Sequence, residues 1–463
     1  MTEQHYAHGW LPVVLPARAR RFRVADGTLA DVLAAAGGEL VHDAPDVEIE
    51  RSLEGVRGDA ALAVVTLDPP PRSGGNRLLR GAARLARSMQ ARLRARGARA
   101  ALRRAGYEQT SVLRWDVTQR VELPFTPPVE RSLAERMPRR ALALGRRGAP
   151  EPTVLEAVLA AAGSEVGREL RPHWASIQAG TALAAADSAI LRVAIGPAAR
   201  AQIEDQVAAL EALRSSEVPP FVDERIPWLL GHGTSGLADW SLERLLPGSR
   251  PARLADALLD DCLAFLVGLH EARGDGEGRS CAETAAILAG VSGDEALRAV
   301  GERLDEELSG LERGFGHGDF FAGNLLAEGD RLTGVLDWDA AGPGRLPVVD
   351  LLHLQLTRVP YGSDEEWGRA VIERLLRSAR SGGDQLVRRY NAELGLDADA
   401  RLLEALVYAY WLEYAAYQVR AHPDRLSSPS WIEGNVRLVA REAASFTNAS
   451  GREAGRAART RRA

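Results

Sequence analysis

The pattern of apolar and polar positions predicts an alternation of strand and helix near the start of the chain. Residues 60–67 form a continuous apolar run, residues 76–104 repeat apolar positions at helical spacing, and residues 110–117 are again rich in strand-forming side chains. Strand, helix and strand in this order are typical of an α/β layer. The segment Ala36-Gly37-Gly38 follows a helical pattern, so we interpret it as a helix stop.

From residue 151 onward the pattern predicts strands first and helices afterwards. Residues 189–193 indicate a strand and residues 202–214 an amphipathic helix. Two short apolar runs at residues 324–326 and 332–336 are spaced as in a β-hairpin. Long helical patterns surround them, at residues 254–271, 364–380 and 400–420. We therefore expect an α+β protein.

Composition changes between residues 121 and 150. Six prolines lie at or near this stretch, around a basic segment at residues 136–147, namely Pro124, Pro127, Pro128, Pro138, Pro150 and Pro152. Such a stretch predicts an interdomain linker with one short helix. The chain of 463 residues is also too long for one core. We expect an accessory α/β domain at 1–120, a linker at 121–150, a larger folded part at 151–445, and a disordered basic tail at 446–463.

Charge and cysteine content exclude several classes of protein. The net charge of −5 argues against a nucleic-acid partner. Two cysteines, Cys262 and Cys281, are too few for a disulfide framework. No apolar run approaches the roughly 20 residues that span a bilayer, and no signal peptide opens the chain. These features predict a cytoplasmic location.

The segment from residue 314 to 355 carries the chemistry. His317-Gly318-Asp319 is followed by Asn324 and, after an apolar run, by Asp337. Transfer of the terminal phosphoryl group of ATP to a hydroxyl needs one carboxylate to orient and deprotonate the acceptor and further oxygen ligands for Mg²⁺. Asp319 fits the first role, and Asn324 and Asp337 fit the second. The alternative is that these residues belong to ordinary turns, which also favour Gly, Asp and Asn.

At these motifs the chain resembles the aminoglycoside phosphotransferase and choline kinase-like family. The residues that carry the resemblance are His317-Gly318-Asp319 with Gly323-Asn324, then Leu336-Asp337-Trp338, and finally Asp350-Leu351. The resemblance implies a bilobal protein-kinase-like domain, with an N-lobe at 151–248 and a C-lobe at 249–445. It also implies that ATP and Mg²⁺ are cofactors, that His317 is a packed brace, and that Asp350 supports the catalytic region.

The resemblance further implies nucleotide-binding residues in the N-lobe. A phosphate-covering loop is expected at residues 176–187 with Gly180, and a hinge for adenine at residues 242–246 with Glu243 and Leu245. The family places a lysine on the strand after the loop and a glutamate on the next helix. Here these positions are Arg192 and Gln206, and the chain contains no lysine at all.

Arg192 leaves two interpretations open. In the first, a strong bias against lysine codons has replaced lysine by arginine at every tolerant position. The Arg192 guanidinium then neutralises the phosphates in place of the usual lysine ammonium. In the second, the ATP site has decayed and the protein is a catalytically silent nucleotide-sensing or scaffold protein. The retention of Asp319, Asn324 and Asp337 together favours an active phosphotransferase.

The first 120 residues carry a second, weaker resemblance. Leu102 to Tyr107 and the strand-forming run after them resemble the end of a class I methyltransferase-like domain, but the glycine-rich turn for its cofactor is missing. We interpret this part as a reduced Rossmann-like unit without catalysis of its own. Eleven arginines and no acid between Pro69 and Tyr107 make the helix at 76–104 basic and amphipathic. Such a helix contacts an anionic membrane surface or a phosphorylated partner, or it is simply solvated.

The helix at residues 400–420 is expected to form part of the acceptor wall. Its aromatic residues suit an aromatic cage for a quaternary amine, but at this spacing they also suit ordinary packing; they are Tyr408, Tyr410, Trp411, Tyr414 and Tyr417. Acids that could receive a cationic acceptor suit a solvated helix face equally well; they are Asp364, Glu365, Glu366 and Glu413. The acceptor is therefore left open among amino sugars, amino alcohols, sugars and lipid-linked intermediates.

Overall fold

The structure is a computed structural model, and it describes residues 8–67, 96–115, 120–121, 140–149, 151–177, 181–272, 278, 280–358, 366–421 and 423–446. The chain divides into two compact units. The first lies within Glu3–Glu204 and Trp228–Leu245, and the second within Asp205–Pro227 and Leu246–Ala463. Helices and strands are mixed throughout, which confirms the expected α+β class. Within the described ranges, no helix is long and apolar enough to cross a membrane.

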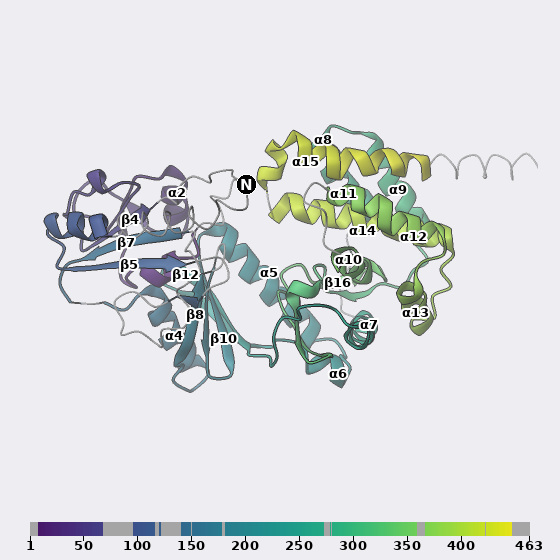
Figure 1. Cartoon of the computed structure of the whole chain (residues 1–463), viewed down its shortest axis with the longest axis horizontal. Coiled ribbons are helices and arrows are strands. Elements are labelled where there is room, and N and C mark those ends of the chain that lie inside the picture. Colours follow the sequence, from purple (N-terminus) through teal and green to yellow (C-terminus); the bar gives the residue numbers. More distant parts are fainter. Residues whose placement is uncertain are drawn as a thin grey trace, which may run out of the picture. The chain divides into compact units, whose positions relative to one another are not determined.

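The first unit begins with a six-stranded sheet whose strands follow the order β2, β1, β3, β4, β7, β5. Strands β2, β1, β3 and β4 run parallel, whereas β7 lies antiparallel between β4 and β5 (Figure 1). The strand bounds are β1 (Arg21–Val24), β2 (Glu39–Leu40), β3 (Val47–Glu50), β4 (Leu62–Leu67), β5 (Gln109–Trp115) and β7 (Arg140–Arg146). Strands β4 and β5 confirm the two strands predicted near residues 60–67 and 110–117.

Helix α2 (Gly27–Ala35) confirms the predicted helix stop. It is followed by Gly37 with φ 92°, a left-handed conformation that favours glycine after a helix. Residues 96–104 are helical, as the pattern predicted, while the rest of the basic helix at 76–104 lies outside the described residues.

Strand β7 corrects the linker prediction, because residues 140–146 form a central strand and not a short helix or a connector. Leu142, Ala143 and Leu144 are all buried, since a central strand is covered on both faces. Flanking arginines and nearby prolines hid this short apolar run. At Gly145, a Cβ atom would lie 2.8 Å from the Tyr107 ring, so the strand packs closely against that side chain. Most of the remaining linker and the basic tail lie outside the described residues.

A second six-stranded sheet of the first unit follows the order β11, β12, β10, β9, β8, β6, and every neighbouring pair is antiparallel. The strands are β6 (Arg120–Val121), β8 (Pro172–Ile177), β9 (Thr181–Ala186), β10 (Ala189–Ile195), β11 (Leu229–Ser235) and β12 (Ala238–Arg244). Strand β10 confirms the strand predicted at 189–193. The predicted phosphate-covering loop is largely strand, β8 ending in it and β9 filling its second half, and the turn with Gly180 lies outside the described residues.

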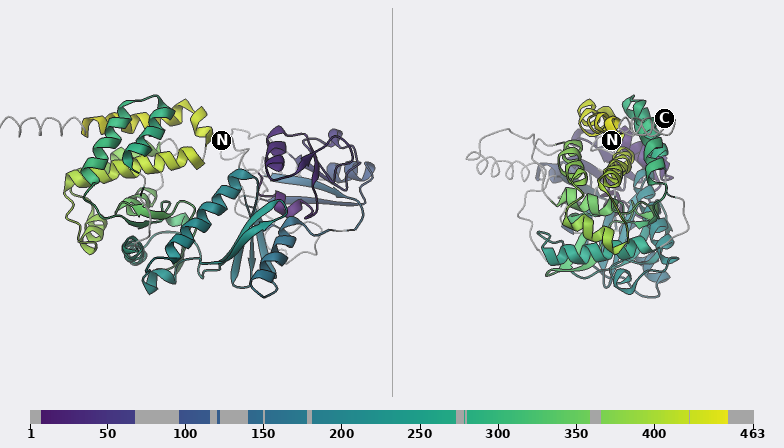
Figure 2. Two further views of the ribbon diagram at one scale, coloured as in Figure 1. Left: turned by 180° about the vertical axis from the view of Figure 1, so that it is seen from behind. Right: turned by 90° about the vertical axis from the view of Figure 1, so that its right-hand side faces the viewer.

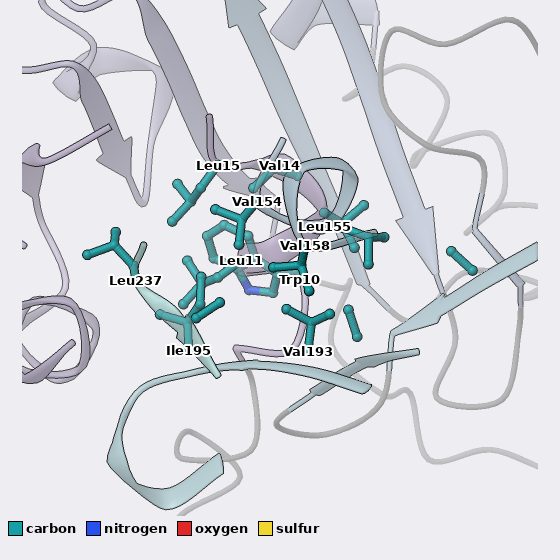
Figure 3. Packing of buried hydrophobic residues seen from close by; sticks show 14 of the residues in the cluster. Trp10, Leu11, Val14, Leu15, Val154, Leu155, Val158, Val193, Ile195 and Leu237 are labelled. Carbon is teal, nitrogen blue, oxygen red and sulfur yellow. The ribbon is translucent and has the colours of Figure 1, made fainter. Parts of the chain in front are cut away.

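Both sheets of the first unit contribute to one hydrophobic cluster. Phe22 and Val64 from the first sheet belong to it together with Val193 from the second. Helices α1 (Leu11–Val14) and α4 (Val154–Glu165) pack within it, as Figure 3 shows around Trp10. Burial of each such side chain stabilises the fold by roughly 1.5–3 kcal/mol. This shared cluster explains why the unit extends across the boundary expected at residues 121–150.

The second unit is mainly helical and contains two small sheets. Strands β14 (Leu325–Glu328) and β15 (Arg331–Val335) form the predicted hairpin, and β13 (Gly314–Gly316) pairs with β16 (Gly342–Arg345). Helix α14 (Ala400–Ala421) packs against α8 (Cys281–Ser292), α9 (Ala296–Leu308), α10 (Val349–Thr357) and α12 (Arg377–Arg380). Figure 2 shows these green and yellow helices from two further directions.

The other helices agree with the predicted pattern. Helix α7 (Asp256–Glu271) and α14 confirm the helices predicted at 254–271 and 400–420, and α5 (Pro197–Arg214) contains the one predicted at 202–214. The segment predicted at 364–380 begins outside the described residues and continues as α11 (Trp367–Ala370), a π-helical turn (Val371–Leu376) and α12. The remaining short helices are α6 (Pro220–Asp223), α13 (Gln385–Glu393) and α15 (Pro429–Ile432).

Candidate active site

Asp350 holds the backbone of the His317-Gly318-Asp319 loop. Its carboxylate accepts a hydrogen bond from the His317 N–H at 2.7 Å and from the Gly318 N–H at 2.8 Å. Asp350 lies in the first turn of α10, so this helix positions the loop directly. Hydrogen bonds to a charged acceptor are about twice as strong as neutral ones. The structure therefore brings together the predicted catalytic loop and the acid predicted to support it.

Gly318 is needed at its position for two reasons. Its φ of 79° lies in the left-handed region, which side chains with a Cβ rarely adopt. A Cβ atom at this position would also lie only 2.3 Å from the Ala340 carbonyl oxygen. The loop consequently passes close to the backbone that follows Asp337 and Trp338.

His317 is fully buried and acts as an internal brace. Its Nε2 lies 3.0 Å from the Leu336 carbonyl oxygen, and its Nδ1 accepts a hydrogen bond from the Asp319 N–H at 3.3 Å. The ring meets Trp338 edge to face, with 4.8 Å between centroids. Burial lowers the pKa of His317, although neighbouring carboxylates oppose the shift. The neutral ring, with its hydrogen on Nε2, therefore joins the loop to the end of the hairpin.

Asn324 connects the catalytic loop to the hairpin. Its Nδ2 donates to the Asp319 backbone oxygen at 3.0 Å and to Asp319 Oδ2 at 3.1 Å, while its own backbone oxygen accepts from the Leu336 N–H at 2.8 Å. Leu325 pairs with Val335 in the hairpin, which places Asn324 beside the residues that precede Asp337. Asp337 itself has φ 61°, an unusual conformation for a residue with a side chain.

The donor set around this loop fits magnesium. Since the Asn324 amide nitrogen donates to Asp319, the amide oxygen is the atom that Asn324 can offer a cation. Among the described residues, no group of three or more His, Cys, Asp or Glu side chains is placed to hold a metal ion. Magnesium is usually held by one or two protein ligands together with substrate phosphates and water. The two predicted ligands, Asn324 and Asp337, are oxygen donors of the kind and number that such a site uses.

His353, which contacts Asp319, was missed by the sequence analysis, and Tyr410 was named there only as part of the acceptor wall. His353 Nε2 lies 3.2 Å from Asp319 Oδ1, and His353 Nδ1 lies 2.9 Å from the Tyr410 hydroxyl. His353 is only 2% exposed and Tyr410 only 1%. One sequence signal could have found His353, because it follows Asp350 by three residues and such residues share one face of a helix. Nothing in the sequence pairs it with Tyr410.

A small hollow beside the predicted catalytic loop is lined by residues of α10 and α14. Its lining includes Gly318, His353 and three tyrosines of the predicted acceptor wall, Tyr410, Tyr414 and Tyr417. The other two aromatic residues of that set are core residues, because Tyr408 packs on Phe446 and the Trp411 indole N–H donates to a backbone oxygen. Glu413 also lines the hollow and forms an ion pair with Arg345 at 2.9 Å.

In the first unit, Arg192 forms an ion pair with Glu243. The Arg192 Nε lies 3.0 Å from Glu243 Oε1, and the Ser241 hydroxyl donates to the same oxygen at 3.1 Å. The Glu243 side chain is 2% exposed and that of Arg192 17% exposed. Glu243 was expected at the adenine hinge, but its carboxylate is buried against Arg192. Strand pairing explains this, because β10 and β12 bring the two positions onto neighbouring strands.

The other predicted nucleotide residues are placed as follows. Gln206 belongs to the second unit and is 3% exposed, and its Nε2 has no hydrogen-bond partner among the described residues. Leu245 is 40% exposed, and its N–H donates to the Ser188 carbonyl at 2.8 Å. The structure thus gives Arg192 a partner in its own sheet, which the predicted pairing with a helix residue had not anticipated.

Comparison with known proteins gives one family match and several distant structural likenesses. No curated protein matches the chain significantly. Three solved structures to which the chain is similar are the following. The gentamicin complex of APH(2″)-IIa is 15% identical, covering 63% of this chain and 97% of that one with a TM-score of 0.41. The macrolide 2′-phosphotransferase MphH from Brachybacterium faecium is 20% identical, covering 61% and 99% with a TM-score of 0.38. LicA in complex with AMP is 12% identical, covering 63% and 98% with a TM-score of 0.42.

The family model with the description "Phosphotransferase enzyme family" matches residues 179–386. The match includes Arg192 as well as Asp319, Asn324, Asp337 and Asp350. The part of the chain at residues 179–386 is therefore similar to the phosphotransferase enzyme family.

Proposed function

We propose that the protein transfers the γ-phosphoryl group of ATP, with magnesium, to a hydroxyl of a small molecule such as an amino sugar, an amino alcohol or a sugar. The observation that carries this proposal is the set of contacts around Asp319. Its carboxylate is contacted by Asn324 on one oxygen and belongs to a loop held by Asp350, and the neighbouring Gly318 lines a hollow. Enzymes catalyse phosphoryl transfer largely by positioning the reacting groups, and these contacts hold the Asp319 carboxylate in place.

In this proposal the chain's residues have distinct roles. Asp319 orients the acceptor hydroxyl and takes its proton as the oxygen attacks the phosphorus, and ADP leaves. Asn324 and Asp337 would hold magnesium, and the bound ion would neutralise phosphate charge. His317 is already committed to the Leu336 carbonyl and stays neutral, so it supports the loop and does not carry the proton.

Arg192 supplies the cation that contacts the phosphates. A guanidinium binds phosphate well and keeps its charge at any physiological pH. Its ion pair with the buried Glu243 supports this role, because the pair holds the guanidinium in one orientation. A lysine at this position has a glutamate partner in related phosphotransferases. Here a glutamate partner is present as well, on a strand.

Calorimetric titration of ATP into the purified protein, with and without magnesium, tests the proposal. We expect binding in the micromolar range that requires magnesium, and ADP release when hydroxyl acceptors are screened. Asp337→Ala should weaken ATP binding only when magnesium is present. Absence of binding at millimolar ATP would contradict the proposal and favour the alternative, a catalytically silent scaffold.

A further inference from the structure

His353 makes polar contacts through both of its ring nitrogens. Nε2 lies 3.2 Å from Asp319 Oδ1, and Nδ1 lies 2.9 Å from the Tyr410 hydroxyl. These contacts connect α14, through α10, to the predicted catalytic carboxylate. A histidine buried only for packing would not need both nitrogens aligned with polar groups on two different elements.

The hydrogen positions follow from the chemistry of the groups. An ionised carboxylate only accepts hydrogen bonds, so the nitrogen that faces Asp319 must carry the hydrogen. In the neutral ring Nδ1 then accepts from the Tyr410 hydroxyl, which selects the tautomer with hydrogen on Nε2. If the ring is protonated, both nitrogens donate and the contact with Asp319 becomes an ion pair. Asp319 meets an N–H group in either state.

The contact leaves Asp319 able to act on an acceptor. A carboxylate has about four positions at which it can accept a hydrogen bond. Asn324 uses one on Oδ2 and His353 faces one on Oδ1, so each oxygen can still accept a further hydrogen bond. Two contacts on different oxygens also fix the rotation of the carboxylate, which is otherwise a soft torsion.

We propose that His353 is a positioning residue for the phosphoryl-transfer reaction, and that Tyr410 sets its tautomer. His353 holds the Asp319 carboxylate in the orientation that meets the acceptor hydroxyl. This inference rests on the proposed function. Other rings pack around His353 and keep it in place, namely Phe321 and Tyr414, with 6.0 Å and 4.6 Å between centroids.

The variants His353→Leu, His353→Gln and Tyr410→Phe test this role. The Leu variant removes the N–H donor, and we expect kcat to fall about 10- to 100-fold with the KM for ATP unchanged. The Gln variant places an amide N–H₂ where Nε2 was, so it should recover kcat to within a few-fold. Tyr410→Phe should give an intermediate loss. Rates are measured as ADP release, with the best acceptor from the screen and with water as acceptor.

Tyr408→Phe is the matched control. It also removes a hydroxyl from α14, but that hydroxyl contacts Glu404 and Arg380, away from Asp319. We expect wild-type rates for this variant. Thermal unfolding of all four variants separates loss of activity from loss of fold. A Leu variant that is folded and fully active, or one that changes only the KM for ATP, would overturn the proposal.

A second measurement does not depend on turnover. Long-range proton–nitrogen spectra of protein labelled at histidine distinguish the two neutral tautomers, and the His353→Gln variant identifies the His353 signals. We expect hydrogen on Nε2 in the wild type and a mixture of tautomers in Tyr410→Phe. A wild-type ring with hydrogen on Nδ1 alone would refute the proposed contact. If the wild-type protein binds no ATP, the proposed function fails, while the tautomer result still decides the contact.

Discussion

The ion pair between Arg192 and Glu243 leads to an asymmetric prediction. Arg192→Met removes the cation and leaves the Glu243 carboxylate, 2% exposed, without its arginine counter-charge. Removal of one partner of a buried pair costs about 3–5 kcal/mol. Glu243→Gln leaves a guanidinium that is 17% exposed and an amide oxygen that can still accept from Arg192 and Ser241. That change should cost about 1–2 kcal/mol.

The double variant decides whether the two side chains act as a pair. In the double variant a methionine faces a neutral amide, so the substitutions remove both charges of the pair together. The double variant should therefore be more stable than the sum of the two single losses predicts, by about 1–3 kcal/mol. Urea-induced unfolding followed by tryptophan fluorescence measures these differences, since Trp240 lies on β12 and belongs to the buried cluster of the first unit. Calorimetry on the same proteins then gives their affinity for ATP.

Two results would refute this reasoning. Additive losses in the double variant would mean that Arg192 and Glu243 do not interact in solution. Equal losses for Arg192→Met and Glu243→Gln would mean that the carboxylate is not the more deeply buried partner. If the pair orients Arg192 for the phosphates, Glu243→Gln should also weaken ATP binding. The Kd should rise by roughly tenfold for each 1.4 kcal/mol of binding free energy that is lost.

Four further predictions concern the second unit. Asp319→Asn should lower turnover by about 10²- to 10⁴-fold in an ADP-release assay and leave ATP affinity nearly unchanged; equal loss of both would contradict its assignment as the base. Gly318→Ala, where the new Cβ would lie 2.3 Å from the Ala340 oxygen, should lower the unfolding temperature more than Gly329→Ala, which has positive φ but open space. Burial raises the pKa of the Cys262 and Cys281 thiols to about 12, so neither should react with a disulfide reagent at pH 8 until the protein unfolds. Burial also lowers the pKa of His317, so the contribution of the neutral ring to stability should be fully present above the unfolded-state pKa of about 6.5. This contribution should be lost as the pH falls further. His317→Gln should therefore flatten the pH dependence of the unfolding temperature.

The candidate catalytic loop could be predicted from the sequence because its residues lie close together along the chain. His317, Asp319 and Asn324 lie within eight residues. The short hairpin that follows them, Leu325 to Val335, leads directly to Asp337. Short loops and alternating apolar runs specify such geometry with little help from the rest of the fold. Asp350 was predicted from the family resemblance, through the motif Asp350-Leu351.

The partners of these residues could not be predicted in the same way. Tyr410 is 57 residues from His353, and Glu243 is 51 residues from Arg192. No periodicity within an element relates positions so far apart, since side-chain patterns report only which face is buried. Strand β7 was missed because prolines and arginines surround its short apolar run in the sequence. Only its pairing with β4 and β5 shows that it is an interior strand.

By itself, the sequence determined the α+β class, most of the long helices and the hairpin, and it predicted the candidate set Asp319, Asn324 and Asp337. Local propensity and the spacing of apolar residues are enough for these features. Tertiary structure alone decided that β7 joins the first sheet and that both sheets of the first unit share one core. It also decided that Glu243 is the partner of Arg192, and that His353 contacts both Asp319 and Tyr410. These depend on contacts between distant segments, and such contacts form only when burial brings whole elements together.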